Sequence, residues 1–290
     1  MYIPAERNFL STISDAYKVT GLPENLFTFA EELKKSQNEL KVKTLQLPIS
    51  GFTYEYDERK DFSYVSGDGY KISLLEASSG LQSYIPLFLV SRNLSMSIND
   101  DEKTRKKKMS VTQVLRMEKE ISDVMQNKNV ANFDEYQETE KIRSRYYNKC
   151  FINIVEEPEQ HLFPTSQREM LINLLEFNNM NEGNKLIITT HSPYLINYLT
   201  FAIKAFIVNK KIKESNNNDK LKLELKKIVS IDSIVNPDDL IIYELNEKEG
   251  TIIKLDDYKG LPSDENYLNK KLADSNDSFA NLLKIEDLCQ

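Results

Sequence analysis

The spacing of apolar positions along this 290-residue chain predicts where its strands and helices lie. Two short apolar runs, 151–155 and 186–188, each end in polar side chains, as buried strands often do. Strands that alternate with helical patterns between residues 150 and 210 are typical of a parallel α/β sheet. Apolar side chains with helical spacing predict three helices, over 24–46, 165–177 and 194–208.

The N-terminal part contains strand-length segments separated by turn residues. These segments predict strands over 52–56, 62–65 and 70–74, which we expect to form a small antiparallel meander. A helix should follow the meander. Proline is tolerated in the first turn of a helix and is costly further inside, so Pro86 predicts that this helix begins near Ser83.

A charged segment at 99–149 divides the chain into three expected parts. These are an N-terminal part at 1–98, a charged helical segment at 99–149 and an α/β core with C-terminal strands at 150–290. We expect the charged segment to form two antiparallel helices that project from the core and bind a partner. Its basic run, Arg105–Lys108, is open to two interpretations, a solvated loop beside acidic residues or a contact with nucleic acid.

The pattern weakens beyond residue 208. A polar stretch of low complexity at 210–219 predicts a loop. A weak helical pattern covers 277–288. Three apolar segments predict strands, over 228–234, 240–245 and 251–255.

Composition and charge limit the class of protein. The chain is 40% hydrophobic and 29% charged, within the range of soluble globular proteins. Its net charge of −7 disfavours a protein that binds nucleic acid over its whole surface. Two cysteines make no disulfide framework, the start is unlike a signal peptide, and the longest apolar run, 85–90, cannot span a bilayer. These features predict a cytoplasmic protein without a membrane partner.

Two adjacent carboxylates, Glu156 and Glu157, end the first apolar strand. Successive strand residues point to opposite sides, so the two acids can take different roles. One can hold Mg²⁺, usually through water, and the other can orient a water molecule for attack on a phosphate. His191 follows the neighbouring strand and can reach a γ-phosphate from there. A solvated acid pair and a helix-capping histidine are the alternatives.

A further candidate lies upstream, at Ser78, Ser79 and Gly80. Hydroxyl and N–H groups at the start of a helix bind anions, so this loop could hold a phosphate. The alternative is an ordinary turn that caps a helix, because serine and glycine are common there for that reason alone.

These motifs together resemble those of ABC-type ATPases, most closely the bacterial AAA-type ATPases with ABC-, SMC- and OLD-like heads. The resemblance covers 76–197 and implies an α/β head with a parallel sheet core, flanking helices, a small antiparallel meander and a helical insertion. It implies that Glu156 is the metal-linked acid of the Walker B motif, Glu157 the catalytic base and His191 the switch histidine.

The same resemblance assigns two loops and the cofactors. It implies that Ser78, Ser79 and Gly80 form the nucleotide-binding signature loop, although Ala77, Ser79 and Leu81 depart from the family pattern. It implies a D-loop at 158–162. Mg²⁺ and ATP are the implied cofactors. The implied D-loop residues are Pro158, Glu159 and His161.

The phosphate-binding Walker A loop has no counterpart in the sequence. That loop needs glycine followed by lysine, and none of the eight glycines here is followed by lysine. In relatives it lies well before the segment that resembles 2–7, so Met1 looks like a start inside the fold. We therefore expect this chain alone to be inactive, as the C-terminal part of an ATPase head.

Two functional hypotheses remain. The first is an ABC-like ATPase that hydrolyses ATP between two heads, as a conformational switch in DNA maintenance or in an anti-phage or toxin-like system. Its partners would be a Walker A-bearing N-terminal half or a second head, in a homodimer, with DNA or an effector protein as further partners. The alternative is a non-catalytic interaction module, a truncated or degenerate head.

Overall fold

The structure is a computed structural model that describes residues 1–290 apart from 14, 41–43, 50, 126–131, 216–217 and 290. Its α-helices are α1 (Glu24–Asn38), α2 (Ser79–Ser97), α3 (Glu102–Lys108), α4 (Val111–Met125), α5 (Asn132–Tyr146), α6 (Pro164–Asn179), α7 (Pro193–Lys213), α8 (Asn218–Ile228) and α9 (Tyr267–Leu288). Its strands are β1 (Tyr2–Ile3), β2 (Thr44–Gln46), β3 (Thr53–Asp57), β4 (Phe62–Gly67), β5 (Tyr70–Ser73), β6 (Ile152–Glu156), β7 (Lys185–Thr189), β8 (Tyr243–Asn246), β9 (Thr251–Lys254), β10 (Asp257–Tyr258) and β11 (Leu261–Pro262).

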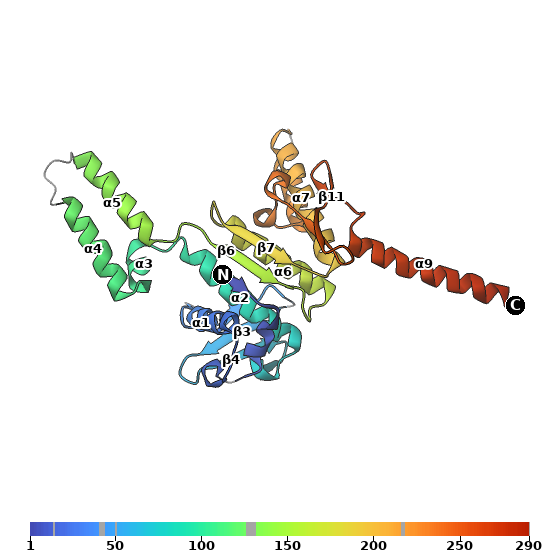
Figure 1. Cartoon of the computed structure of the whole chain (residues 1–290), viewed down its shortest axis with the longest axis horizontal. Coiled ribbons are helices and arrows are strands. Elements are labelled where there is room, and N and C mark those ends of the chain that lie inside the picture. The colour runs from blue at the N-terminus through green and yellow to red at the C-terminus, as the bar shows by residue number, and fades with distance from the viewer. Residues whose placement is uncertain (14, 41–43, 50, 126–131, 216–217, 290) are drawn as a thin grey trace.

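A three-stranded parallel sheet in the order β1-β6-β7 lies at the centre of the molecule (Figure 1). Ile3 pairs with Val155, about 150 residues later in the chain, and Ile154 pairs with Ile187. The sheet therefore joins the N-terminal part to the α/β part. The predicted α/β fold, with a parallel core, flanking helices and a small antiparallel sheet, is confirmed.

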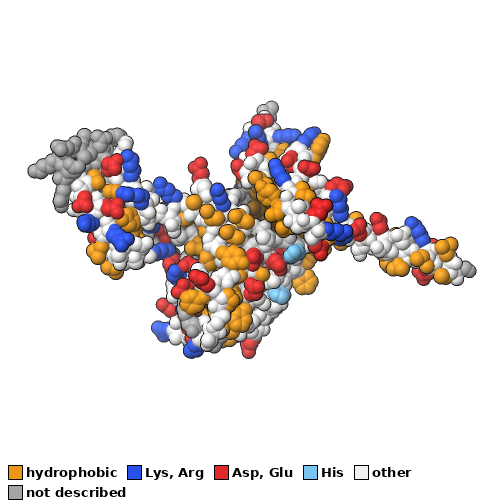
Figure 2. All heavy atoms as spheres, viewed as in Figure 1, with side chains coloured by type: hydrophobic (Ala, Val, Ile, Leu, Met, Phe, Trp, Pro, Cys, Tyr) orange, Lys and Arg blue, Asp and Glu red, His pale blue; other side chains and the backbone are white. Residues whose placement is uncertain are grey.

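The two faces of this sheet differ in burial. On one face Ile3 and Val155 are fully buried against α2 and α6, and Asn153 donates a hydrogen bond to Ser91 of α2 at 3.0 Å. On the other face Ile152 and Ile187 are 45% and 50% exposed. Figure 2 shows hydrophobic side chains over the middle of the molecule, where Figure 1 places β6 and β7. We call the face that α2 and α6 cover the finished face, and the partly exposed face the open face.

The N-terminal lobe is built on an antiparallel sheet in the order β2-β3-β4-β5, with α1 and α2 packed in the same core. The predicted meander is present, but the predicted helix over 24–46 is wrong at its end. The helix α1 stops at Asn38, and residues 44–46 form β2, which pairs with β3. Cross-strand pairing, which helical spacing cannot reveal, decides the conformation there.

The helix α2 begins at Ser79, so the predicted start near Ser83 is wrong and Pro86 lies inside the helix. A proline removes the N–H that would bond the carbonyl four residues earlier, here that of Gln82. The Ser11 hydroxyl donates to that carbonyl at 2.8 Å. A partner distant in sequence thus satisfies the group that the proline leaves free.

The segment 99–149 contains the two expected helices, α4 and α5, which pack on each other and project from the rest of the molecule (Figure 1). The short helix α3 precedes them and carries the basic run. Two of its lysines are paired with acids: Lys106 with Glu118 at 2.5 Å, and Lys108 with Glu39 at 2.6 Å and Asp100 at 2.9 Å. Much of the basic run therefore neutralises neighbouring carboxylates.

The C-terminal part departs most from expectation. The predicted loop at 210–219 is too long, because α7 continues to Lys213 and α8 begins at Asn218; residues 216–217 lie outside the described residues. The predicted strand at 228–234 is wrong, because α8 continues to Ile228 and a 3₁₀ turn follows at Ile231–Ser233. Apolar contacts that join α7 to α8 explain the helices; they involve Ala205, Ile212, Leu225 and Val229.

The last segment of the chain forms two short hairpins and a long helix. The pairs β8-β9 and β10-β11 are antiparallel. The predicted helix at 277–288 is part of the longer α9, whose N-terminus is capped by Asn266 and which extends away from the rest of the molecule (Figure 1). Within the part of the chain that the structure describes, we find no helix with the length and apolar character needed to cross a membrane.

Candidate functional site

Glu157 and His191 lie at the carboxyl ends of the adjacent parallel strands β6 and β7. The two strands stay in register to the end, because Glu156 pairs with Thr189 and the Glu157 N–H donates to the Thr189 carbonyl at 2.9 Å. The Glu157 Oε1 atom lies 3.7 Å from the His191 Nε2 atom. The His191 side chain is 85% exposed and that of Glu157 is 36% exposed. A carboxylate and an imidazole thus face solvent together at one sheet edge.

A tight turn follows Glu157 and holds it against the loop after β7. Glu157 and His161 both have positive φ angles, of 40° and 61°, which non-glycine residues seldom adopt. Glu159 connects the turn to the loop, since its Oε1 atom accepts from the Thr190 hydroxyl and from the His191 N–H, both at 2.7 Å. The Gln160 side chain donates to Glu157 Oε2 at 3.5 Å. These contacts fix the turn and the loop relative to each other.

The neighbouring acid, Glu156, faces different groups. Its Oε2 atom accepts from the Ala5 N–H at 3.4 Å. A hydrogen bond to Glu156, with burial as a second cause, raises the pKa of the Tyr2 hydroxyl to about 12. Glu156 is thus turned toward β1, and Glu157 toward β7. No cluster of three or more potential metal-ligating side chains is present among the described residues.

The Ser78–Gly80 loop lies against the turn that carries His161. Ser78 caps α2, with its hydroxyl oxygen accepting from the Leu81 N–H at 3.5 Å. A Cβ atom added to Gly80 would lie only 2.8 Å from the carbonyl oxygen of His161. The fold therefore brings the loop at the start of α2 next to the 158–162 turn, although about 80 residues separate them.

Arg7 supports the strand end and is a residue that the sequence interpretation did not single out. Its side chain is fully buried and donates to the carbonyls of Glu156 and Glu157 at 2.8 and 2.9 Å. Burial lowers the pKa of the guanidinium to about 10, while nearby carboxylates, Glu159 first among them, act in the opposite direction. A sign of this role in the sequence is the position of the arginine, just after the short apolar segment at the start of the chain.

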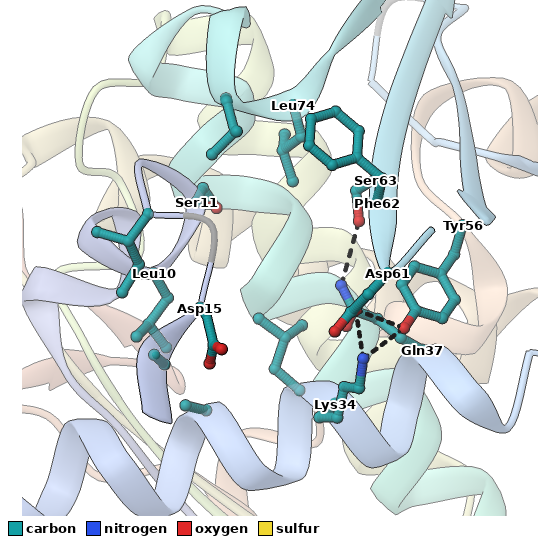
Figure 3. A pocket seen from close by; sticks show the side chains of 15 residues that line it. Leu10, Ser11, Asp15, Lys34, Gln37, Tyr56, Asp61, Phe62, Ser63 and Leu74 are labelled. Atoms are coloured by element: carbon teal, nitrogen blue, oxygen red, sulfur yellow. Dashed lines mark hydrogen bonds and ion pairs between the residues drawn. The ribbon is translucent and has the colours of Figure 1, made fainter. Parts of the chain in front are cut away.

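A cavity of about 120 Å³ lies apart from this edge, in the N-terminal lobe (Figure 3). Lys34, Gln37 and Tyr56 line its polar side together with Asp61. The Lys34 ammonium donates to the Tyr56 hydroxyl at 2.6 Å and to Asp61, and Gln37 donates to Ser63 at 3.2 Å. These polar groups thus bond to one another, and the cavity contains none of the strand-end residues.

Residues 9–196 match the model of the AAA ATPase domain family. This range includes the Ser78–Gly80 loop, both strand-end acids and His191. The chain belongs to the AAA ATPase domain family. The family indicates ATPase activity, and its members generally use ATP and Mg²⁺ and often form oligomers. No curated protein and no solved structure matches the chain.

Proposed function

We propose that this AAA ATPase domain chain is part of an ABC-like ATPase head, with Glu157 as the base that orients the attacking water and His191 as the contact to the γ-phosphate. The supporting observation is the 3.7 Å approach of these side chains at the carboxyl edge of adjacent parallel strands. Ligands of open α/β sheets bind at that edge. A positioned base of this kind contributes about 10²–10⁴ in rate.

Glu156 is the residue that would hold Mg²⁺, through water. Mg²⁺ in nucleotide sites takes one or two carboxylates together with phosphate oxygens and waters, so it needs no closed cluster of protein ligands. Glu156 supplies one carboxylate at the correct sheet edge, and the Ala5 N–H holds that carboxylate in place. When bound, the ion neutralises charge that develops on the phosphates.

The phosphate cradle comes, in this proposal, from another polypeptide segment. The open face and the outer edge of the central sheet support this proposal, because another segment could pack there. Among the described residues β7 pairs with β6 alone, and Ile152 and Ile187 are about half exposed. Parallel sheets are almost always covered on both faces, and an open strand edge readily accepts another strand. We infer that a strand leading into a Gly-Lys-Ser/Thr loop adds beside β7.

A second head would use the Ser78–Gly80 loop. This loop begins α2, whose N-terminus carries the partial positive charge that attracts phosphate, and Ser79 is exposed. The close approach of Gly80 to the 158–162 turn supports a surface that includes both loops. We propose that this surface closes over nucleotide held by the second head and that hydrolysis releases it, as a switch in DNA maintenance or in an anti-phage or toxin-like system.

The test completes the head. The reading frames that flank the coding sequence are read for a Gly-x-x-x-x-Gly-Lys-Ser/Thr loop, and the segment that carries it is expressed with this chain, fused or as a second polypeptide. We expect Mg²⁺-dependent release of phosphate from ATP that falls at least about 100-fold in Glu157→Gln. Lys185→Ala, at the opposite end of β7, is the matched control and should keep the activity.

A completed head that binds ATP and does not hydrolyse it would contradict the proposal. That result would favour the alternative, an interaction module without catalysis. Equal rates for the wild-type protein and Glu157→Gln would also contradict it, since they would assign the hydrolysis to another group.

A further inference from the structure

Arg7 makes hydrogen bonds to three segments of the chain from a fully buried position. Its Nη1 atom donates to Pro4 at 3.1 Å and to Glu156 at 2.8 Å, and its Nη2 atom donates to Glu157 at 2.9 Å. Its Nε atom donates to Ser83, in the second turn of α2, at 3.2 Å. Every acceptor is a backbone carbonyl. The guanidinium thus ties the end of β6 to the start of α2.

Burial of the Arg7 guanidinium costs free energy that simple filling of the core would not require. A buried cation loses its hydration, and an apolar side chain would fill the same volume without that penalty. The lowered pKa of Arg7 reflects this desolvation. The planar fork of a guanidinium can bond several carbonyls in fixed directions, whereas a lysine ammonium is a compact point charge. The geometry therefore depends on arginine specifically.

The backbone that Arg7 holds is the part that aims the Glu157 carboxylate. Glu157 adopts a left-handed conformation, which costs about 1 kcal/mol or more in a non-glycine residue and persists when neighbours hold it. Its N–H is held by Thr189 and its carbonyl by Arg7 and by the Gln160 N–H at 3.0 Å. Its carboxylate then faces His191. A shift of the carbonyl would turn the carboxylate away.

The same N-terminal segment holds α2 at a second point. The Ser11 hydroxyl bonds the Gln82 carbonyl that Pro86 leaves free, one residue before the carbonyl that Arg7 bonds. The helix that begins at the Ser78–Gly80 loop is therefore fixed to the same segment as the strand end. The two parts of the proposed site share one support.

We propose that Arg7 is a positioning residue that sets the Glu157 carboxylate relative to His191 and to α2. This inference rests on the proposed function, because that function gives Glu157 its role. Arg7 itself is buried behind the strand end and acts through Glu157.

The test uses the two histidines of the chain as reporters. Ring-labelled histidine gives nuclear magnetic resonance signals from His161 and His191 only, and a His161→Asn variant assigns them. Glu157→Gln defines the His191 ring shifts without the carboxylate charge. In Arg7→Lys we expect the His191 shifts to move by more than half of the difference between wild type and Glu157→Gln, while circular dichroism shows a folded protein.

Arg168→Lys is the matched control. Arg168, on α6, also donates to a backbone carbonyl, that of Ile228, and no hydrogen bond or ion pair found among the described residues joins it to the strand end. This variant should leave the His191 shifts at their wild-type values. Wild-type His191 shifts in folded Arg7→Lys would overturn the inference.

A second measurement covers the case in which Arg7→Lys does not fold. In the wild-type chain the Nε–H of Arg7 should exchange with solvent at least about 100-fold more slowly than that of Arg168, because it is buried and hydrogen-bonded. Equal exchange rates would overturn the inference. Neither readout depends on ATP, so a failure of the proposed function would appear separately, in the phosphate-release assay on the completed head.

Discussion

The two faces of the central sheet have the same strands and different surroundings. On the finished face Ile3 and Val155 are fully buried under α2 and α6. On the open face Ile152 and Ile187 are about half exposed, and the outer edge of β7 has no partner strand among the described residues. The candidate site lies at the end of these strands. In the proposed function, this chain supplies the strand-end residues and the phosphate-binding segment joins the sheet on its open side.

The largest effect should come from placing a charge on the finished face. Val155→Asp buries an unpaired carboxylate and should lower the free energy of unfolding by about 4 kcal/mol or more. Ile187→Asp, the matched change on the open face, should lower it by less than about 1 kcal/mol. Urea unfolding followed by circular dichroism measures both. Similar losses in the two variants would show that the open face is packed in solution and would break the comparison.

A smaller effect should follow from the polar contact on the finished face. Asn153→Ala removes the hydrogen bond to Ser91 and leaves a buried hydroxyl without that donor, so we expect a loss of about 1–3 kcal/mol. Lys185→Ala, at an exposed position of β7, should change the free energy of unfolding by about 0.5 kcal/mol at most. A double-mutant cycle with Ser91→Ala should give a coupling of about 1 kcal/mol. No coupling would mean that the two side chains do not meet.

The smallest effect concerns the sheet edge. Backbone N–H groups of β7 that point away from β6 should exchange with solvent faster than those of β6, whose neighbours are β1 and β7. Hydrogen exchange detected by nuclear magnetic resonance measures this in the chain alone. In the completed head the same groups of β7 should become protected. Protection already present in the chain alone would mean that the edge is covered by part of this chain.

The sequence predicted those elements of the fold that depend on residues close together in the chain. The apolar runs that precede Glu156, Glu157 and His191 form the adjacent parallel strands β6 and β7, as their apolar and polar pattern indicated, although one face of these strands is open. Turn residues likewise indicated the antiparallel meander.

The predictions that failed concern elements and residues whose structure depends on partners distant in sequence. Pro86 suggested a late helix start, and only the Ser11 hydroxyl, supplied from the N-terminal turn, explains an earlier one. The last turn of α7 and the helix α8 carry many polar side chains. They are helical because Ile212 and Leu225 make apolar contacts. Arg7 gave little signal, because its acceptors are backbone carbonyls, which have no sequence signature.

The most direct measurement of the central claim is phosphate release from ATP by this chain alone. The purified chain and Glu157→Gln are incubated with Mg²⁺ and ATP under the same conditions, and released phosphate is measured over time. Because no glycine of the chain is followed by lysine, we predict that the wild-type rate does not exceed that of Glu157→Gln. Sustained turnover by the wild-type chain that is lost in Glu157→Gln would contradict the account, because it would show that this chain already contains a complete nucleotide site.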